Sequence, residues 1–479
     1  MICFIIIQQR RCKERMPQEL TGEKTNIKKS KFEMDMCSGS ILKKMLLFSI
    51  PLILSSVLQL LFNTADVIVV GKYAGRDSLS AVGSTGSLIN LFVNLFMGLS
   101  VGTNVVVARL FSAKKNQDVT EAVHSSITIS LIGGVILTII GIFLAPQLLK
   151  LMNTPDSLLD LASLYVRIYF VGITASLIYN FGSAILRAIG DTRRPLIFLI
   201  IAGIVNVVLN LFFVIVLKLD VAGVAIATTI SQCLSAFLVI RCLIKEQSAV
   251  HLSLKELRIY KDKLISILKI GIPAGVQGSL FALSNVAIQS AINSFGEIVM
   301  AGNAAAANLE GYVYVSMNAI HQATISFIGQ NVGGKKYERI NKIIFTAIGC
   351  VTVVGLVLGL SMYIGGNILL YFYTKDAAVV SAGMIRLKYV STVYFLCGIM
   401  DVLVGALRGL GRSIMPMIVS LMGACVFRLV WIFTIFKIER FHIIETVYIS
   451  YAISWILTAA VHATCLYVIR RTMKKHWGV

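Results

Sequence analysis

The sequence predicts an all-α polytopic membrane protein with about twelve transmembrane helices in two parallel six-helix repeats. Three observations support this fold class. Of 479 residues, 57% are hydrophobic and only 14% are charged, whereas soluble domains hold about 25% charged residues. The apolar residues fall in long blocks, each near the roughly 20 residues that one helical crossing requires. The two halves of the chain also resemble each other at a nearly constant offset.

The apolar blocks define the predicted spans and the domain organisation. The first six lie near 45–70, 79–107, 123–149, 161–186, 195–217 and 221–242, and the second six near 264–291, 299–328, 343–368, 384–407, 414–436 and 443–469. We therefore expect a basic tail (1–44), an N-terminal lobe (45–242), a linker (243–263), a C-terminal lobe (264–470) and a short tail (471–479). Met16, Met34 and Met36 are alternative translation starts, and SLKEL in the linker is expected to form a short surface helix.

Lysine and arginine concentrate in alternate loops, for example at Lys114, Arg193 and Lys335. Because basic loops stay on the cytoplasmic side of a membrane, we expect both termini to be cytoplasmic and the protein to be in the cell (inner) membrane. The same placement accounts for the net charge of +21. No nucleic-acid-binding motif accompanies this charge, so we expect membrane lipid and no nucleic acid as a partner.

An internal repeat is the most informative feature of the chain. The loop LRAIGDTRRP (Leu186 to Pro195) pairs with LRGLGRSIMP (Leu407 to Pro416), and its arginines give an offset of 408 − 187 = 221. The same offset pairs Lys114 with Lys335. An even number of spans in each repeat makes the two halves point the same way across the membrane. In such an arrangement, substrate sites lie between or within the bundles.

Three of the 23 acidic residues lie well inside predicted spans: Asp66, Glu310 and Asp401. A charged acid in lipid costs about 2.5–3.5 kcal/mol on insertion scales. None of the three has an acidic counterpart in the other repeat at the offset of 221, so the duplicated scaffold does not explain them. We expect Glu310 and Asp401 to line a substrate cavity, with an ion pair between Asp401 and Arg428 as the alternative.

Polar residues recur with helical spacing in several spans. In the first span Gln59, Asn63 and Asp66 share one helix face. Further stripes place Asn94 on the second span, Asn206 and Asn210 on the fifth, and Asn285 on the seventh. Such faces either converge around a hydrated cavity or form interhelical hydrogen bonds worth about 0.6 kcal/mol each. A carboxylate among them is suited to binding a proton, Na⁺ or an organic cation.

Several motifs in this order resemble the multidrug and toxic-compound extrusion (MATE) family of bacterial transporters. They are PLILSSVLQLLFNTADVIVVGKYAG, the paired LRAIGDTRRP and LRGLGRSIMP loops, and NVVLNLFFV followed by VAGVAIATTISQ. The likeness covers about residues 34–470. It implies two six-helix lobes around a V-shaped cavity and alternating access. It also implies export of small organic cations or amphipathic compounds, driven by inward H⁺ or Na⁺, by a protein that we expect to be monomeric.

The resemblance also implies roles for individual residues. The coupling-ion or proton site comprises Asp66, Asn63, Asn180, Asn206, Asn210 and Thr228, and the expected substrate cavity contains Gln59, Asn94, Asn285, Glu310 and Asp401. The chain departs from the family pattern at Asn210, where related members carry an acid. Asp66 must then act alone or with the asparagines as oxygen donors, which suits Na⁺ as well as a proton. We expect no cofactor and no structural metal.

One alternative function comes from the same superfamily, a flippase for lipid-linked oligosaccharides. Its cavity would be expected to carry many basic residues for pyrophosphate, whereas this chain offers Arg428 and the span-edge Arg167 and Lys388. Enzyme signatures are absent from the sequence, including a zincin histidine pair, a nucleophile elbow and a phosphate-binding Gly-Lys-Ser/Thr loop. The sequence therefore predicts a secondary transporter and no catalytic residues.

Overall fold

A computed structural model describes residues 32–152 and 154–477, and every regular element in these ranges is a helix. The first 31 residues of the predicted N-terminal tail lie outside the described residues. The described N-terminal helices are α2 (Ile41–Val69), α3 (Gly75–Ser112), α4 (Asn116–Leu151), α5 (Asp156–Ala188), α6 (Arg193–Leu211) and α7 (Asp220–Lys245). π-Helical turns η1 (Val70–Ala74) and η2 (Phe212–Val216) extend α2 and α6. These helices correspond to the six predicted spans of the N-terminal lobe.

The C-terminal lobe contains more breaks than hydropathy predicts. It consists of α8 (Lys261–Asn293), α9 (Glu297–Gly333), α10 (Arg339–Ile364), α11 (Gly366–Tyr371), α12 (Ala377–Tyr389), α13 (Phe395–Gly409), α14 (Ile414–Ser420), α15 (Phe427–Phe433) and α16 (Ile444–Trp477). The span predicted at 384–407 is a pair of helices, α12 and α13, bent by 44°. The span predicted at 414–436 is interrupted by the π-helical segment η5 (Leu421–Val426).

Ten described helices are long and apolar enough to cross a membrane, and the α12–α13 pair makes up to eleven. The remaining predicted span, 299–328, lies within α9, a helix of 37 residues. Asn303, Glu310 and Gln330 are among the polar residues of α9. The chain is therefore a multi-pass membrane protein.

The repeat predicted from the loops is present in the helix positions. The starts of α3 and α9 differ by 297 − 75 = 222 residues, and those of α5 and α12 by 377 − 156 = 221. Backbone geometry repeats as well: Lys114 and Lys335 both adopt positive φ, 57° and 55°, and so do Gly190 (95°) and Gly411 (71°). Non-glycine residues rarely adopt this left-handed conformation. Its occurrence at Lys114 and Lys335 therefore shows that the duplicated turns share a geometry.

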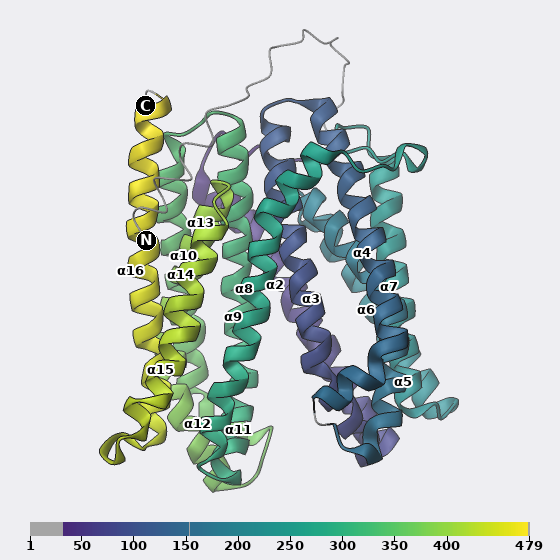
Figure 1. Ribbon diagram of the computed structural model, residues 1–479, viewed down its shortest axis with the longest axis vertical. Coiled ribbons are helices and arrows are strands. Elements are labelled where there is room, and N and C mark those ends of the chain that lie inside the picture. The colour runs from purple at the N-terminus through teal and green to yellow at the C-terminus, as the bar shows by residue number, and fades with distance from the viewer. Residues whose placement is uncertain (1–31, 153, 478–479) are drawn as a thin grey trace.

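The two lobes meet where α3 packs against α8. Figure 1 shows α4 to α7 on one side of the molecule and α10 to α16 on the other. Gly98 and Gly102 of α3 lie against Gly271 and Gly275 of α8, so closely that a Cβ at Gly98 would overlap the Gly275 backbone. We call these four glycines the glycine seam. Small residues allow helix backbones to approach closely in membranes, which explains this contact between the lobes.

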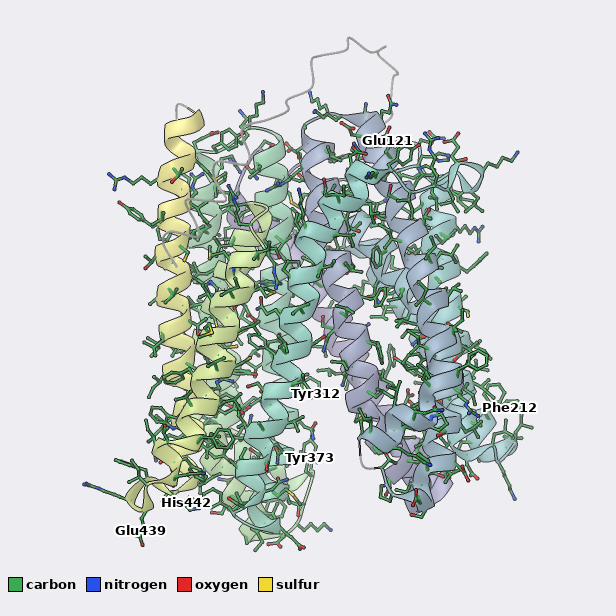
Figure 2. The ribbon with its side chains drawn as sticks, in the orientation of Figure 1. Glu121, Phe212, Tyr312, Tyr373, Glu439 and His442 are labelled. Atoms are coloured by element: carbon green, nitrogen blue, oxygen red, sulfur yellow. The ribbon has the colours of Figure 1, made fainter. Side chains whose placement is uncertain are left out.

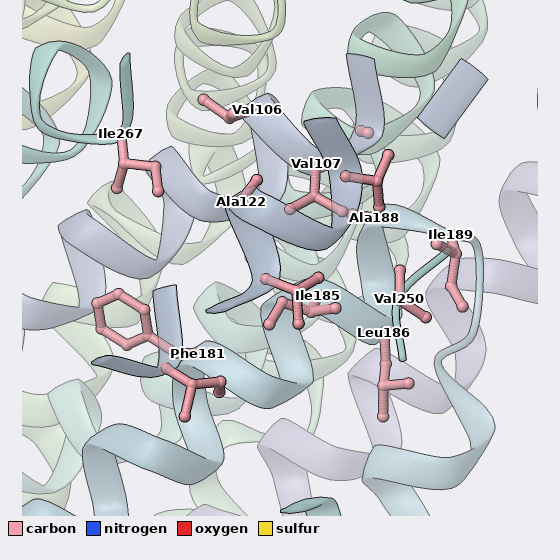
Figure 3. Close-up of a cluster of buried hydrophobic side chains, with 14 of the residues drawn as sticks. Val106, Val107, Ala122, Phe181, Ile185, Leu186, Ala188, Ile189, Val250 and Ile267 are labelled. Carbon is pink, nitrogen blue, oxygen red and sulfur yellow. The ribbon is translucent and has the colours of Figure 1, made fainter. Parts of the chain in front are cut away.

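The linker packs into the core of the N-terminal lobe. Val250 of the linker and Ile267 of α8 lie in one buried cluster with Val107, Phe181 and Ile185, as Figure 3 shows. The stretch predicted to be a short surface helix forms only a three-residue 3₁₀ turn, η3 (Leu254–Glu256). The linker therefore attaches the start of α8 firmly to the N-terminal lobe.

The loops that contain or adjoin the Lys/Arg clusters gather at one end of the molecule, which we call the basic end (loops 113–115, 189–192, 334–338 and 410–413). In Figure 2, Glu121 lies near this end, whereas Glu439 and His442 lie at the opposite end. Lys263 of α8 forms ion pairs here with Asp118 and Glu121 of α4. That this end faces the cytoplasm remains a prediction.

The residues just before α2 cross the basic end from one lobe to the other. The Met34 N–H donates to the carbonyl oxygen of Ile189 (3.1 Å) in the N-terminal lobe. The Met36 N–H donates to Gln330 Oε1 (3.1 Å), and Asn331 Nδ2 donates to the Met36 carbonyl oxygen (3.0 Å), both on α9. We call residues 34–37 the strap, because they are bonded to both lobes.

Candidate functional site

Asp66 is held by a polar network that connects three helices of the N-terminal lobe. Asn210 Nδ2, on α6, donates a hydrogen bond to Asp66 Oδ1 on α2. The same nitrogen lies 3.3 Å from Asn206 Oδ1, and Asn206 Nδ2 donates to Thr228 Oγ1 of α7 at 3.3 Å. The structure thus brings together four of the six residues predicted for the coupling site through direct contacts.

The network borders a cavity of about 130 Å³ inside the N-terminal lobe. The predicted residues among its lining are Gln59, Asn63, Asp66, Asn180, Asn206 and Thr228. Gln59 therefore lies with the coupling residues and apart from the substrate residues with which the sequence grouped it. Asn180 contributes to the lining, but its Nδ2 donates to the Ser176 carbonyl oxygen on its own helix (2.8 Å). We call this the N-lobe cavity.

Several lining residues of the N-lobe cavity were not singled out from the sequence. They include Ser231, Gln232 and Ser235 on α7. The three α7 residues follow Thr228 at spacings of three, four and seven, which places them on the same helix face. This periodicity is a signal in the sequence that could have identified them.

Among the described residues, no basic side chain forms an ion pair with Asp66. None of the ion pairs in the described part of the chain includes it. Beside it, Asn210 Oδ1 is buried and has no hydrogen-bond donor. A carboxylate and an amide oxygen without a donor form an environment that favours a cation, either a proton or a hard metal ion such as Na⁺.

Local helix irregularities adjoin this site. The π-helical turn η1 begins four residues after Asp66, and η2 begins two residues after Asn210. π-Helical turns inside helices occur frequently at functional sites. The helices α2 and α6 also touch here. The ring of Phe62 on α2 lies against Gly203 of α6, where a Cβ would overlap the ring. Glycine at this position therefore lets α2 approach α6 closely enough for Asp66 to reach Asn210.

A second, larger cavity of about 390 Å³ lies mainly in the C-terminal lobe. Three predicted substrate residues line it: Asn94 of α3, Asn285 of α8 and Asp401 of α13. Arg428 of α15 lines it as well, together with aromatic residues of α16 that the sequence did not single out, Tyr451 and Trp455. We call this the C-lobe cavity.

Asp401 and Arg428 share this cavity. The sequence offered an ion pair between them as an alternative, but none of the ion pairs among the described residues joins these two side chains. Arg428 Nε instead donates to Ser454 Oγ on α16 (2.8 Å). The centre of its guanidinium group lies 4.2 Å from the centre of the Tyr451 ring. Contacts with α16 therefore hold the guanidinium away from the carboxylate.

Glu310 does not line either cavity, contrary to its predicted place in the substrate cavity. Its Oε2 forms a buried ion pair with Arg386 Nη2 of α12 (2.7 Å), and Ser391 Oγ donates to its Oε1 (3.3 Å). Arg386 Nη1 also donates to Asn303 Oδ1 (2.6 Å). The partner explains the difference: an acid whose Oε2 accepts two hydrogen bonds from one arginine is neutralised inside the bundle and needs no ligand.

The family model MatE matches residues 51–212 and 273–434, two stretches whose starts differ by 273 − 51 = 222 residues. The chain belongs to the MATE family. Because the model matches each half once, the predicted duplication of the MATE fold is confirmed. Members of this family are membrane transporters, not enzymes.

Individual MATE relatives and structures resemble most of the chain. The probable multidrug resistance protein YpnP of Bacillus subtilis (strain 168) is 30% identical over 82% of this chain and 88% of its own length. The multidrug export protein MepA of Staphylococcus saprophyticus is 23% identical over 78% of this chain and 83% of its own length. A structure described as the outward-facing conformation of a multidrug resistance MATE family transporter matches with a TM-score of 0.86. It is 23% identical and covers 94% of this chain and all of its own, which supports the same fold.

Proposed function

We propose that the protein is a secondary active antiporter that exports small organic cations or amphipathic compounds across the cell membrane in exchange for H⁺ or Na⁺. The observation that carries this proposal is Asp66, a carboxylate in a membrane-embedded cavity with amide and hydroxyl neighbours and no basic partner among the described residues. A carboxylate at this depth is costly without a partner, so it is suited to binding a cation. The relatives named for multidrug resistance and multidrug export support the class of substrate.

Transport would follow from competition between the ion and the substrate. With Asp66 ionised, one state of the protein binds a cationic substrate. Arrival of H⁺ or Na⁺ neutralises the carboxylate and favours a second state with lower affinity for the substrate. Such coupling requires each ligand to bind the two states with different affinity.

Alternating access would require the lobes to separate at the basic end. Two contacts described above oppose this separation: the glycine seam between α3 and α8, and the strap between Ile189 and α9. Both connect the lobes without a covalent bond across the interface. Their release is therefore the expected structural event when the transporter opens toward this end.

The flippase alternative receives less support from the cavities. A lipid-linked pyrophosphate would need several cationic side chains to bind its charges. Arg428 is the one basic residue among the described residues that line the C-lobe cavity, and it shares the cavity with Asp401. This balance favours the antiporter.

Transport in proteoliposomes tests the proposed function. We expect the wild type to move rhodamine 123, an aromatic cation, when a H⁺ or Na⁺ gradient is imposed. Asp66→Asn should lower ion-driven transport at least about tenfold, because it removes the charge whose neutralisation by the ion favours the state with lower affinity for the substrate. Asp160→Asn, the same change at an exposed acid of α5, is the matched control. Full ion-driven transport by Asp66→Asn would show that the proposed coupling site is wrong.

A further inference from the structure

The C-lobe cavity contains one acidic and one basic side chain that do not neutralise each other. Asp401 comes from α13 and Arg428 from α15, and both line the same space. Of the other described lining residues, none is a lysine, arginine, aspartate or glutamate. The cavity therefore presents one charge of each sign.

The guanidinium of Arg428 is positioned but incompletely bonded. The residue is only 6% exposed, and among its nitrogens Nε alone has a hydrogen-bond partner within the described part of the chain. Nη2 is buried without a partner. Stacking against Tyr451 at 4.2 Å and Trp455 at 5.5 Å fixes the plane of the group. A buried donor without an acceptor is unfavourable, and a carboxylate matches the planar geometry of arginine best.

The carboxylate of Asp401 is likewise not bonded by the protein. The described residues offer its side chain no hydrogen bond or ion pair. The neighbouring His321 Nδ1 contacts the Asp401 backbone carbonyl oxygen (2.6 Å) and not the carboxylate. Arg408 is bound to Gln277 Oε1 of α8 (2.9 Å). Within the described residues neither group donates a hydrogen bond to the Asp401 carboxylate, so its oxygens remain available to a ligand, although Arg408 lies near enough to act on its charge.

We propose that the C-lobe cavity selects aromatic zwitterions, compounds that carry a carboxylate as well as a cationic nitrogen. Arg428 binds the carboxylate, Asp401 binds the cationic nitrogen, and the rings of Tyr451 and Trp455 contact the aromatic body. A volume of about 390 Å³ lies within the roughly 300–1,000 Å³ typical of sites for drug-sized ligands. This inference rests on the proposed function and specifies the substrate class that it exports.

Rhodamine 110 and rhodamine 123 form a matched pair of fluorescent probes. They share the cationic aromatic system, but rhodamine 110 has a free carboxylate where rhodamine 123 has a methyl ester. Binding to the purified full chain is measured by fluorescence polarisation. We expect the wild type to bind rhodamine 110 about tenfold more tightly than its ester, because a hydrogen-bonded charge pair is lost in the ester.

Variants assign this preference to the two side chains. Arg428→Gln should remove the preference and so change the ratio of the two Kd values about tenfold, and Arg428→Lys should restore part of it. Asp401→Asn should weaken both dyes and change the ratio much less, because both dyes carry the cation. Size-exclusion profiles establish that each variant is folded, and the comparison of the two dyes on the wild type tests the proposal without any variant.

The possible failures are distinguishable. Equal binding of both dyes by the wild type, or an unchanged ratio in folded Arg428→Gln, would overturn the zwitterion selectivity. Ion-driven transport of rhodamine 123 in that case would leave the proposed antiporter intact. Absence of ion-driven transport of either dye would overturn the proposed function, and with it this inference.

Discussion

Asn210 determines how many acidic groups the N-lobe cavity offers to the coupling ion. Its amide donates to Asp66, so the substitution Asn210→Asp would place two carboxylates in contact. Two carboxylates at that distance do not both ionise easily. The pair therefore retains one proton, which the two groups share. We therefore expect Asn210→Asp to raise the ratio of H⁺-driven to Na⁺-driven rhodamine 123 transport at least about threefold.

The control for this experiment is Asn116→Asp, the same change at the exposed start of α4. Transport is measured in proteoliposomes with either gradient imposed alone. If the ratio of H⁺-driven to Na⁺-driven transport changed equally in both variants, the added negative charge would act through the electrostatic potential of the whole protein and not at Asp66.

Glu310 is expected to stabilise the C-terminal lobe. Glu310→Ala leaves Arg386 buried without its carboxylate, which typically costs about 3–5 kcal/mol. Thermal unfolding monitored by fluorescence-detected size exclusion should show a clear loss of stability. The exposed Glu439→Ala is the control. The double replacement Glu310→Met with Arg386→Met should recover much of the loss, because no unpaired charge then remains; a double variant as unstable as Glu310→Ala would contradict this explanation.

Predicted polar residues lie together where a stripe on one helix faces stripes on its neighbours, and their role as a coupling-ion site remains a prediction. Asn63 and Asp66 share a face of α2, and Asn206 and Asn210 share a face of α6, so helical periodicity was enough to bring them together. Glu310 differed because its partner, Arg386, is 76 residues away and lies at the edge of a predicted span. Sequence spacing contains no signal for that long-range pair.

Among the elements, the packing of α3 on α8 depends on the absence of side chains. In Gly98→Leu the new side chain would overlap the backbone of α8. Overpacking a close contact typically costs about 1–3 kcal/mol, so we expect a lower thermal unfolding midpoint. Gly86→Leu, on the same helix, is the matched control because no atom lies within 4 Å of a Cβ there. If both variants unfold alike, the loss comes from the helix itself and not from the interface.

Hydropathy located the helical segments but not their interruptions. Hydropathy is averaged over a window of about 19 residues. The mean hydropathy therefore stays high across the break between α12 and α13 and across the π-helical segment after α14. The bend of 44° has no proline or charged residue at the break itself, where Ser391, Thr392 and Val393 form a 3₁₀ turn. Ser391 of this turn donates a hydrogen bond to Glu310 of α9, a tertiary contact that hydropathy does not register.

Across the whole molecule, the strap connects the lobes at the basic end. Deleting residues 1–39 removes its bonds to Ile189 and α9 but keeps Ser40, which caps α2. We expect this deletion to increase the population in which the lobes are apart at the basic end. Spin labels at the exposed positions Gln117 and Lys342, in a background without native cysteines, should report longer distances by electron paramagnetic resonance.

Deletion of residues 1–31 is the control for the strap, because it keeps every strap contact described above. Its distance distribution should match that of the full chain. Equal distributions for all three proteins would show that the strap does not influence the position of the lobes.

The duplication made the whole-molecule architecture accessible from one sequence. The offset between LRAIGDTRRP and LRGLGRSIMP anticipated the equal spacing of the starts of α5 and α12 and of the turns at Gly190 and Gly411. The contact between the repeats was not predicted, because the offset relates equivalent positions and contains no information on how the lobes face each other. The glycine seam shows which faces of α3 and α8 are in contact, and this is visible only in the structure.

On the two proposals above, the coupling ion binds at Asp66 in one cavity and the substrate binds at Asp401 and Arg428 in the other, so the charge of the substrate is independent of that of the ion. On the proposed cycle, exchange of one inward cation for one exported monocation moves no net charge across the membrane. Export of a zwitterion through the same exchange moves one positive charge inward. A membrane potential of 100 mV, negative inside, then contributes about 2.3 kcal/mol per cycle. The membrane voltage would therefore drive export of zwitterions directly, while export of monocations would depend on the ion gradient alone.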